Sequence, residues 1–436
     1  MHPLVALLYE GTARAARLAS WLAARLAWRF EPLGYRKTRR SLAARRGVLK
    51  RWRAWAARVR DPARELLWVH APSVGEGLQA RPVIERLRVT HPDLQLAYTF
   101  FSPSAEAFAR GLPVDGADYL PFDTAYDARA MVDALRPRAL VFSKLDVWPV
   151  LASVAASRGV RLGLISATLA ERSGRRSAIG RAVLEDAYRR LDLVGAISPE
   201  DAGRLTSLGV RESAIRVTGD TRYDQVWARA QSTDRRSELL APLASDRPTL
   251  VAGSTWYADL IPLYEAWRAV RGEVPGIRMI VAPHEPREAY LGMEERWADA
   301  RGIRCARLGA ADAGAADLVL VDRVGVLGDL YALAHVAYVG GGFHAAGLHS
   351  VLEPAAFGVP VLFGPRHRAS RDAGMLLACG GGASVRSAGD LCLRLVEWLG
   401  SPAAAARAGD AAREMVRAGL GAAERSAALV TELLLS

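Results

Sequence analysis

Short apolar runs rich in β-branched residues alternate with longer helical patterns from residue 65 to the C-terminus. Helical patterns such as 76–88 and 105–112 lie between the runs. This alternation is typical of βαβ units that build buried parallel sheets. The predicted strands form two series: 65–71, 94–101, 117–121, 138–144, 161–167, 193–198 and 215–219, and then 248–254, 277–283, 317–322, 336–342 and 359–364.

A polar, charged and helix-prone stretch, 225–247, separates the two series. We therefore expect an N-terminal α/β domain over 31–224 and a C-terminal α/β domain over 225–436, with the last helix able to pack back on the first domain. Open α/β sheets bind ligands at the carboxyl ends of their strands. The pattern thus predicts a functional cleft where the two sets of strand ends face each other.

The first thirty residues read as one amphipathic helix. Charged residues such as Glu10, Arg14 and Arg17 share one side, and Leu4 and Leu8 lie on another. A helix crossing a bilayer would place Arg14 and Arg17 in hydrocarbon at roughly 2.5–3.5 kcal/mol each. We expect residues 1–30 to lie in the membrane interface instead, with the polybasic stretch 35–60 on anionic lipid. A helix docked on the protein and an RNA-binding segment are the alternatives.

Composition narrows the class of protein. The chain has 436 residues, of which 51% are hydrophobic, and its three cysteines and eight histidines form no CxxC, HExxH or HxH pattern. Neither a disulfide scaffold nor a dedicated metal centre is indicated. Residues 1–60 hold fifteen Lys and Arg against two acids, so the remaining chain carries about −1 of the total +12. A protein that binds nucleic acid over its whole surface is disfavoured.

Polar residues follow two predicted strands of the first series. Glu76 lies in the glycine-flanked turn after 65–71, where a carboxylate can act as a general base or only as a favourable charge at a helix N-terminus, worth roughly 0.3–1 kcal/mol. Lys144 and Asp146 follow the strand 138–144. They can bind an anionic substrate group or orient a neighbouring carboxylate, or they form a solvated ion pair.

The second series carries candidate ligand-binding residues after its strands. Small residues in a turn and a triple glycine let backbone N–H groups approach phosphate oxygens. His349 and Ser350 begin a predicted helix, and Glu353 can accept hydrogen bonds from a ribose diol; a capping box explains Ser350 and Glu353 equally well. The candidates are Ser254, Thr255, Pro283, His284, Gly341, Gly342, His349, Ser350 and Glu353, with 364–367 able to close the same site.

Taken together and in order, these motifs resemble those of the 3-deoxy-D-manno-octulosonic acid (Kdo) transferases of lipopolysaccharide biosynthesis. The resemblance spans nearly the whole chain. Its most specific parts are SVGE and the block that runs from the triple glycine to LEPA. The matching segments are HAPSVGEG (70–77), FSKLDVWP (142–149), GSTW (253–256), APHEP (282–286), GGGF (340–343) and GLHSVLEPAAFGVPVLFGP (347–365).

The resemblance implies a GT-B fold, in which two Rossmann-like domains face each other across a cleft. It implies transfer of Kdo, with inversion and without a metal or cofactor, from CMP-Kdo to the glucosamine disaccharide of a lipid A precursor. The enzyme would work at the cytoplasmic face of the inner membrane, on anionic lipid and without nucleic acid. Glu76 corresponds to the family's proposed general base. The matching CMP-binding positions are Pro283, His284, Gly325, Val326, Leu327, Ser350, Val351, Leu352 and Glu353.

Three positions depart from the family pattern. Lys144 stands where many members have the first acid of Glu-Thr-Glu-x-Trp-Pro, His284 stands where the arginine of Pro-Arg-His is common, and Ser350 replaces an asparagine. We therefore expect the donor phosphate to be neutralised by residues other than that arginine. Two competing functions are a GT-B nucleotide-sugar enzyme with another donor and a non-enzymatic membrane adaptor. The near-neutral charge beyond residue 60 argues against the adaptor.

Overall fold

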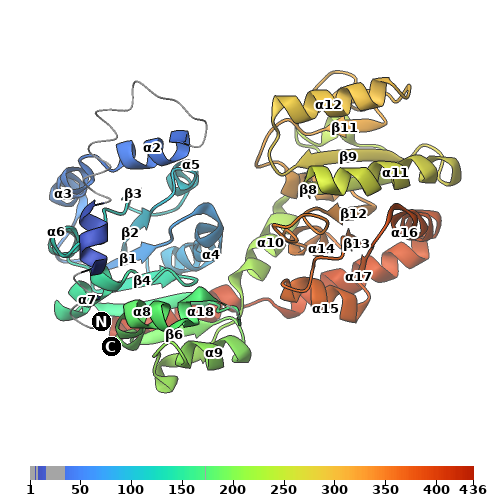
Figure 1. The fold of residues 1–436 in the computed structure, drawn as a ribbon. Helices are drawn as coiled ribbons and strands as arrows, with labels where there is room; N and C mark the ends of the chain where they lie inside the picture. The colour runs from blue at the N-terminus through green and yellow to red at the C-terminus, as the bar shows by residue number, and fades with distance from the viewer. Residues whose placement is uncertain (1–4, 6–7, 16–34, 172) are drawn as a thin grey trace. The chain divides into compact units, whose positions relative to one another are not determined.

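A computed structural model describes residues 5, 8–15, 35–171 and 173–436 (Figure 1). The chain forms two compact units. The N-terminal unit comprises residues 1–225 together with 420–436, and the C-terminal unit comprises residues 226–419. The division between them falls within a single helix, α10 (Thr221–Ser232).

The N-terminal unit is built on a seven-stranded parallel sheet with the order β3-β2-β1-β4-β5-β6-β7. All seven strands overlap the runs that the sequence predicts, although β3 begins one residue before its run. The central ones are entirely buried, as expected of strands covered by helices on both faces. Their bounds are β1 (Leu66–His70), β2 (Gln95–Phe100), β3 (Gly116–Tyr119), β4 (Ala139–Ser143), β5 (Arg161–Ala167), β6 (Leu193–Ala196) and β7 (Ile215–Val217).

Helices cover both faces of this sheet because the chain leaves its centre in two directions. From β1 it moves outward to β2 and β3, and from β4 it moves the opposite way to β5, β6 and β7. Right-handed crossovers then place the two sets of helices on opposite faces. The helices are α2 (Tyr35–Ala44), α3 (Val48–Val59), α4 (Val74–Thr90), α5 (Ala105–Arg110), α6 (Ala125–Leu135), α7 (Pro149–Ser157), α8 (Ala178–Arg189) and α9 (Pro199–Thr206), with short 3-10 turns η1 (Gly174–Arg176) and η2 (Glu212–Ala214).

The C-terminal unit repeats the architecture with the strand order β10-β11-β9-β8-β12-β13-β14. All its pairings are parallel too. The strands are β8 (Thr249–Thr255), β9 (Arg278–Pro283), β10 (Cys305–Arg307), β11 (Leu318–Leu320), β12 (Val336–Val339), β13 (Val361–Phe363) and β14 (Gly382–Ser384). The helices are α11 (Tyr257–Glu273), α12 (Glu288–Asp299), α13 (Leu327–Leu330), α14 (Leu352–Ala356), α15 (Arg371–Cys379), α16 (Ala388–Gly400) and α17 (Pro402–Ala418), with η3 (Ala241–Leu243) and η4 (Tyr331–Leu333).

Two strands of this sheet, β10 and β14, are absent from the sequence prediction. Each has three residues and lies at an edge of the sheet. Cys-Ala-Arg and Gly-Ala-Ser carry no run of apolar or β-branched residues. They are strands only because the neighbouring strands β11 and β13 offer free backbone groups to pair with.

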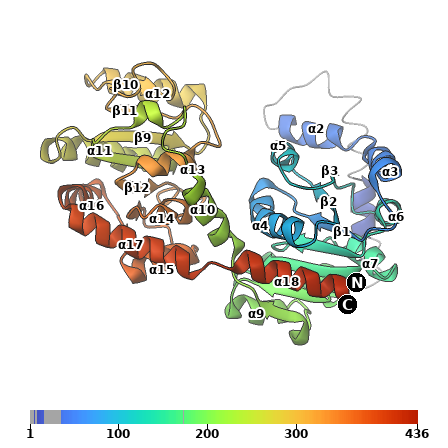
Figure 2. The same ribbon diagram turned by 180° about the vertical axis from the view of Figure 1, so that it is seen from behind.

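The last helix, α18 (Ala422–Leu435), packs within the N-terminal unit beside α4 (Figure 2). Its Leu429, Val430 and Leu433 belong to the core under β4, β5 and β6. Both oxygens of Asp224 accept hydrogen bonds from the start of the helix, at Gly421 N (2.8 Å) and Ala423 N (2.9 Å). These caps satisfy donors that the first helical turn would otherwise leave without a partner.

The predicted interfacial segment, residues 1–30, lies mostly outside the described residues. Residues 8–15 are helical and contact the N-terminal unit, where the Tyr9 hydroxyl donates to Asp123 Oδ2 at 3.0 Å. Leu8 in the same turn is exposed. No helix among the described residues combines the length and the apolar character needed to cross a bilayer.

One arginine of the polybasic stretch has a structural role. Arg45 is buried and donates to the carbonyl oxygens of Leu120 (3.2 Å) and Phe101. Its guanidinium stacks over the ring of Phe101 at 3.6 Å, and burial lowers its pKa to about 10. Arg45 is therefore not available to lipid, whereas Arg46 and Lys50 are exposed.

Candidate active site

The N-terminal sheet brings its chemistry-bearing residues together at the ends of β1 and β4. These strands are paired, and the chain leaves them toward opposite sides of the sheet. Such a topological switch point leaves a crevice at the carboxyl ends of the two strands. Glu76 follows β1, and Lys144 and Asp146 follow β4, so the first three candidates converge on this crevice.

Glu76 lies in the first turn of α4, where Ser73 is the N-cap. The Ser73 hydroxyl donates to Glu76 Oε2 and also accepts from Gly75 N at 3.2 Å. Lys144 Nζ lies 3.4 Å from Glu76 Oε1, and the Ser143 hydroxyl donates to the Glu76 carbonyl oxygen at 3.0 Å. Gly77 is required at the next position, because a Cβ there would collide with the ring of Phe108.

These contacts keep Glu76 ionised. Burial opposes its ionisation, but the hydrogen bond from Ser73 and the positive charge of Lys144 outweigh burial and hold the pKa of Glu76 below its usual range. The nearby His70 is a poor alternative base. It is fully buried, and burial lowers its pKa to about 3, so the ring is neutral at physiological pH.

Lys144 and Asp146 are each held in place. Lys144 has a left-handed backbone, with φ of 67°, and its N–H donates to the Ile165 carbonyl oxygen at 2.8 Å. An unfavourable backbone of this kind is often found at functional sites. Asp146 accepts a hydrogen bond from Arg175 Nη2 at 2.6 Å, and burial raises its pKa against the opposing charge of Arg175. Arg175, in η1, is a member of this cluster that no sequence motif indicated.

The C-terminal sheet has its own switch point between β8 and β12. The chain passes from β8 through α11 to β9 on one side, and from β12 through α14 to β13 on the other. Three glycines, Gly340 to Gly342, follow β12 at this point. A Cβ at any of them would collide with backbone, at Ser254, Gly347 and Gly364 respectively. The predicted glycine-rich edge is therefore closely packed backbone.

Ser254 and Thr255 end β8 with an irregular register against β9. Ser254 has a φ of 53°, and Thr255 is buried with no partner for its hydroxyl among the described residues. Pro283 ends β9, and the N–H of His284 donates to the Thr255 carbonyl oxygen at 2.9 Å. This hydrogen bond joins the predicted loop at Thr255 directly to the predicted loop at His284.

A cluster of four rings occupies this edge: Trp256, His284, His344 and His349. We call these four residues the ring cluster. Trp256 stacks on His344 at 4.2 Å and on His284 at 4.7 Å, and its Nε1–H donates to His349 Nε2 at 2.9 Å. Trp256 and His344 were not among the residues proposed from the sequence, although Trp256 lies in the motif GSTW.

The segment 325–327 reaches the same edge. Gly325 has a φ of 91° and its carbonyl oxygen accepts a hydrogen bond from Arg229 at 3.1 Å. Arg229 also forms two hydrogen bonds with Asp329, both at 3.0 Å. Val326 is the N-cap of α13, and a Cβ at Gly253 would collide with the Tyr331 hydroxyl and with Leu327.

The segment 350–353 does not form the capping box that was the alternative explanation of Ser350 and Glu353. The N-cap of α14 is Val351, without a side-chain cap, so Ser350 and Glu353 do not cap this helix. Ser350 is exposed, whereas the side chains of Val351 and Leu352 are fully buried and leave only backbone for a ligand. Burial raises the pKa of Glu353 against the opposing charge of Arg229.

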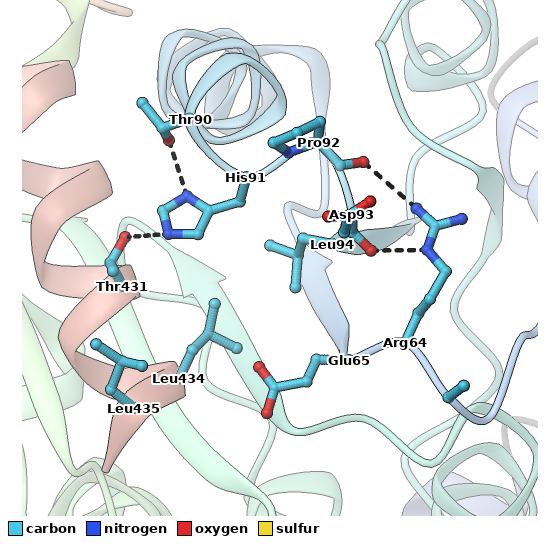
Figure 3. A pocket seen from close by; sticks show the side chains of 11 residues that line it. Arg64, Glu65, Thr90, His91, Pro92, Asp93, Leu94, Thr431, Leu434 and Leu435 are labelled. Atoms are coloured by element: carbon cyan, nitrogen blue, oxygen red, sulfur yellow. Dashed lines mark hydrogen bonds between the residues drawn. The ribbon is translucent and has the colours of Figure 1, made fainter.

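A separate cavity of about 590 Å³ lies at the other edge of the N-terminal sheet (Figure 3). Its walls include Glu65, which precedes β1, and His91 and Asp93, which precede β2. The His91 ring lies between Thr90 (2.8 Å) and Thr431 (3.5 Å). Because this edge holds the amino ends of the strands, the cavity is separate from the switch-point residues.

The chain is similar to one family of known proteins. Residues 40–225 match the family model for 3-deoxy-D-manno-octulosonic-acid transferase (kdotransferase). The 3-deoxy-D-manno-octulosonic acid transferase of Bordetella pertussis is 30% identical over 390 residues, which cover 85% of this chain and 88% of the relative. That of Haemophilus influenzae is 26% identical and covers 84% and 86%.

Solved structures support the architecture. The UDP-GlcNAc 2-epimerase of Neisseria meningitidis has a TM-score of 0.60 at 13% identity, covering 85% of this chain and 99% of that chain. A putative UDP-N-acetylglucosamine 2-epimerase from Listeria monocytogenes also has a TM-score of 0.60, at 12% identity. At these identities the likeness concerns the fold, two Rossmann-like domains of the GT-B type. Because the sequence relatives span most of both chains, this chain belongs to the 3-deoxy-D-manno-octulosonic acid transferase family and is a glycosyltransferase that transfers Kdo.

Proposed function

We propose that this enzyme transfers Kdo from CMP-Kdo to a hydroxyl of the glucosamine disaccharide of a lipid A precursor, with inversion and with Glu76 as the general base. The observation that carries the proposal is the position of Glu76 at the N-terminal switch point, ionised and 3.4 Å from Lys144. A sugar hydroxyl is a poor nucleophile, so its proton must leave as the new bond forms.

A single carboxylate base suits an inverting displacement. The oxygen of the acceptor hydroxyl forms the bond to the anomeric carbon, the bond to the CMP phosphate oxygen breaks, and the hydroxyl proton goes to Glu76. CMP leaves as an anion, which needs charge stabilisation more than protonation. The second carboxylate of the cluster, Asp146, is paired with Arg175. This pairing makes Asp146 a poor candidate for a nucleophile, and it supports a one-step mechanism.

The acceptor would contact the N-terminal unit through Lys144 and Asp146. A lipid A precursor carries phosphate groups, and Lys144 is 40% exposed, so its ammonium group can reach an anionic substituent while it remains beside Glu76. Lys144 would therefore have two roles: it holds the pKa of Glu76 low, and it attracts the anionic acceptor.

The donor would bind at the C-terminal switch point. The turn at Ser254 would bring backbone close to the phosphate oxygens, and the family resemblance assigns the ribose to Glu353. The loop after β9 contributes Pro283 and His284, the segment 325–327 contributes backbone, and the imidazoles of the ring cluster take the place of an arginine.

The lipid acceptor implies work at a membrane surface. We propose peripheral attachment at the cytoplasmic face of the inner membrane through the N-terminal segment and through exposed cations such as Arg46, Lys50 and Arg53 of the basic stretch. Arg46, Lys50 and Arg53 are all exposed, whereas Trp52 of α3 is buried, so these three cations are available to anionic headgroups.

Mass spectrometry of a lipid A precursor incubated with CMP-Kdo and the purified enzyme tests the reaction. We expect a mass increase of one or more Kdo residues, with inverted anomeric configuration by NMR. In thermal shift assays CMP should protect the enzyme and UDP should not. If CMP protects the enzyme but the lipid A precursor stays unmodified, the proposed acceptor is wrong. Thermal protection by UDP alone would refute CMP-Kdo as the donor.

A further inference from the structure

The ring cluster contains a hydrogen bond that determines which nitrogen of a histidine carries a proton. Trp256 Nε1–H donates to His349 Nε2 at 2.9 Å. An indole nitrogen is only a donor, so Nε2 of His349 must be the acceptor and carries no proton. The neutral ring then carries its proton on Nδ1. The described residues offer no acceptor to that Nδ1–H group.

The surroundings of His349 keep its ring neutral. Burial lowers its pKa, and the neighbouring rings of His284 and His344 lower it further, whereas Asp259 acts in the opposite direction. Asp259 is buried and already accepts four hydrogen bonds, from Trp256 N (2.9 Å), Gly341 N (2.8 Å), Phe343 N (3.2 Å) and the Tyr338 hydroxyl (3.0 Å). Its oxygens are therefore engaged with groups other than the imidazoles.

His344 is oriented in the same manner. Its Nδ1 accepts a hydrogen bond from Ala346 N at 3.1 Å, so the neutral ring carries its proton on Nε2. Asp259 also holds the backbone of Gly341 and Phe343, which lead into this loop. Two neutral imidazoles with assigned N–H groups thus lie at the glycine-rich edge where β8, β9 and β12 end.

We propose that Trp256 is a positioning residue that holds His349 as a neutral Nδ1–H donor for an anionic oxygen of the donor substrate. The inference rests on the proposed function, because it takes the C-terminal switch point as the donor site. The anionic oxygen belongs to the phosphate of the nucleotide or to the carboxylate of the sugar. A neutral donor binds it without taking up a proton, so donor affinity should not depend on pH near neutrality.

Replacing Trp256 by phenylalanine isolates the hydrogen bond. The phenylalanine side chain retains an aromatic ring for stacking on His284 and His344 but has no N–H group. Nε2 of His349 then becomes free to take a proton, and we expect both tautomers and a higher pKa of His349. An imidazolium binds an anion more tightly than a neutral ring does, so the CMP affinity of Trp256→Phe relative to the parent at the same pH should increase as the pH falls through the range in which His349 titrates. The matched control is Trp297→Phe, because Trp297 stacks on Tyr264 outside the ring cluster.

Histidine-labelled full-length enzyme gives the spectroscopic test by two-dimensional NMR between ring nitrogens and carbon-bound protons. We expect the parent and Trp297→Phe to show the Nδ1–H form of His349 from pH 6 to 8, and Trp256→Phe to show a mixture. A His349 spectrum unchanged in Trp256→Phe would overturn the proposal. This measurement needs no ligand, so it is independent of the donor assignment.

Calorimetry with CMP and with cytidine tests the ligand. We expect the CMP dissociation constant of Trp256→Phe to rise about fivefold to tenfold at pH 8 and less than twofold at pH 6, with cytidine binding unchanged. If the CMP dissociation constant of Trp256→Phe equals that of the parent, the partner of His349 is the Kdo carboxylate, and only the KM for CMP-Kdo should rise. An equal loss of affinity for CMP and for cytidine at both pH values would overturn the proposal. If the parent itself binds no CMP, the proposed donor is refuted instead.

Two substitutions of His349 keep the proposal falsifiable if Trp256→Phe does not fold. An asparagine amide nitrogen lies near the position of Nδ1, and a glutamine amide nitrogen lies near that of Nε2. His349→Asn should therefore weaken CMP binding less than His349→Gln does, by at least threefold, and without pH dependence. The opposite order would overturn the assignment of Nδ1–H as the donor.

Discussion

Replacement of Glu76 by glutamine tests the chemistry most directly. Glutamine has the shape of glutamate, and its carbonyl oxygen can still accept the hydrogen bond from Ser73. Its amide nitrogen replaces the second carboxylate oxygen and has no affinity for a proton. The substitution therefore removes the base and the ion pair with Lys144 while it keeps the shape of the side chain and the hydrogen bond from Ser73.

The expected magnitudes separate catalysis from stability. A positioned general base contributes roughly 10²–10⁴-fold to kcat, which corresponds to about 2.7–5.5 kcal/mol of activation free energy. The substitution also removes the ion pair between Glu76 and Lys144, and the Lys144 side chain is 40% exposed. Exposed pairs contribute only about 0.2–1 kcal/mol to folding. The rate should therefore fall by orders of magnitude while the thermal midpoint moves by a few degrees at most.

Initial rates at saturating CMP-Kdo and lipid acceptor measure the effect on kcat. Glu85→Gln is the matched control, because it removes the same charge from the exposed side of α4. The control should keep parental activity, and CMP binding should be unchanged in both variants. A Glu76→Gln enzyme within threefold of the parent would show that Glu76 is a structural carboxylate at a helix N-terminus and not the base.

Four further outcomes are expected. Lys144→Met should move the acid limb of the kcat/KM profile to higher pH, because the lysine charge helps to hold the pKa of Glu76 low; an unmoved limb would contradict this coupling. Glu353→Ala should raise the CMP dissociation constant at least tenfold in calorimetry, since a hydrogen bond to a charged group is worth about 1.5–3 kcal/mol. Unchanged affinity would exclude Glu353 from the donor site. EDTA should not change the CMP affinity of the parent. Burial raises the pKa of Glu294 to about 7, so the parent loses stability as the pH rises from the pKa of this residue in the unfolded chain through 7. Glu294→Gln should therefore raise the thermal midpoint at pH 8 and leave it unchanged near pH 4. Equal midpoints of the variant and the parent at pH 8 would refute this. Leu433→Ala should cost about 2–5 kcal/mol in denaturant unfolding because Leu433 is fully buried against the N-terminal sheet, and a loss below 1 kcal/mol would mean that α18 adds little to this core.

The sequence determined the elements that bury themselves and the places where chemistry can occur. Seven runs of the first half and five of the second are apolar enough to be interior strands, and all twelve contain strands of the two sheets. Glu76, Lys144 and Asp146 were identifiable because polar residues directly after a buried strand lie at the carboxyl edge of a parallel sheet. Lys144 and Glu76 lie 68 residues apart in the chain and are in contact.

Only the tertiary structure decided which strands are neighbours, and this determines which strand ends form a site. The adjacency of β1 and β4, and of β8 and β12, creates the two switch points, and no local pattern encodes it. The three-residue strands β10 and β14 exist because of their neighbours. The buried role of Arg45, the pairing of Arg175 with Asp146 and the contact of Trp256 with His349 likewise depend on residues distant in the chain. Hydrophobic periodicity reports whether a residue is buried, whereas the partner of a polar side chain is set by the packing of segments that the sequence pattern does not relate.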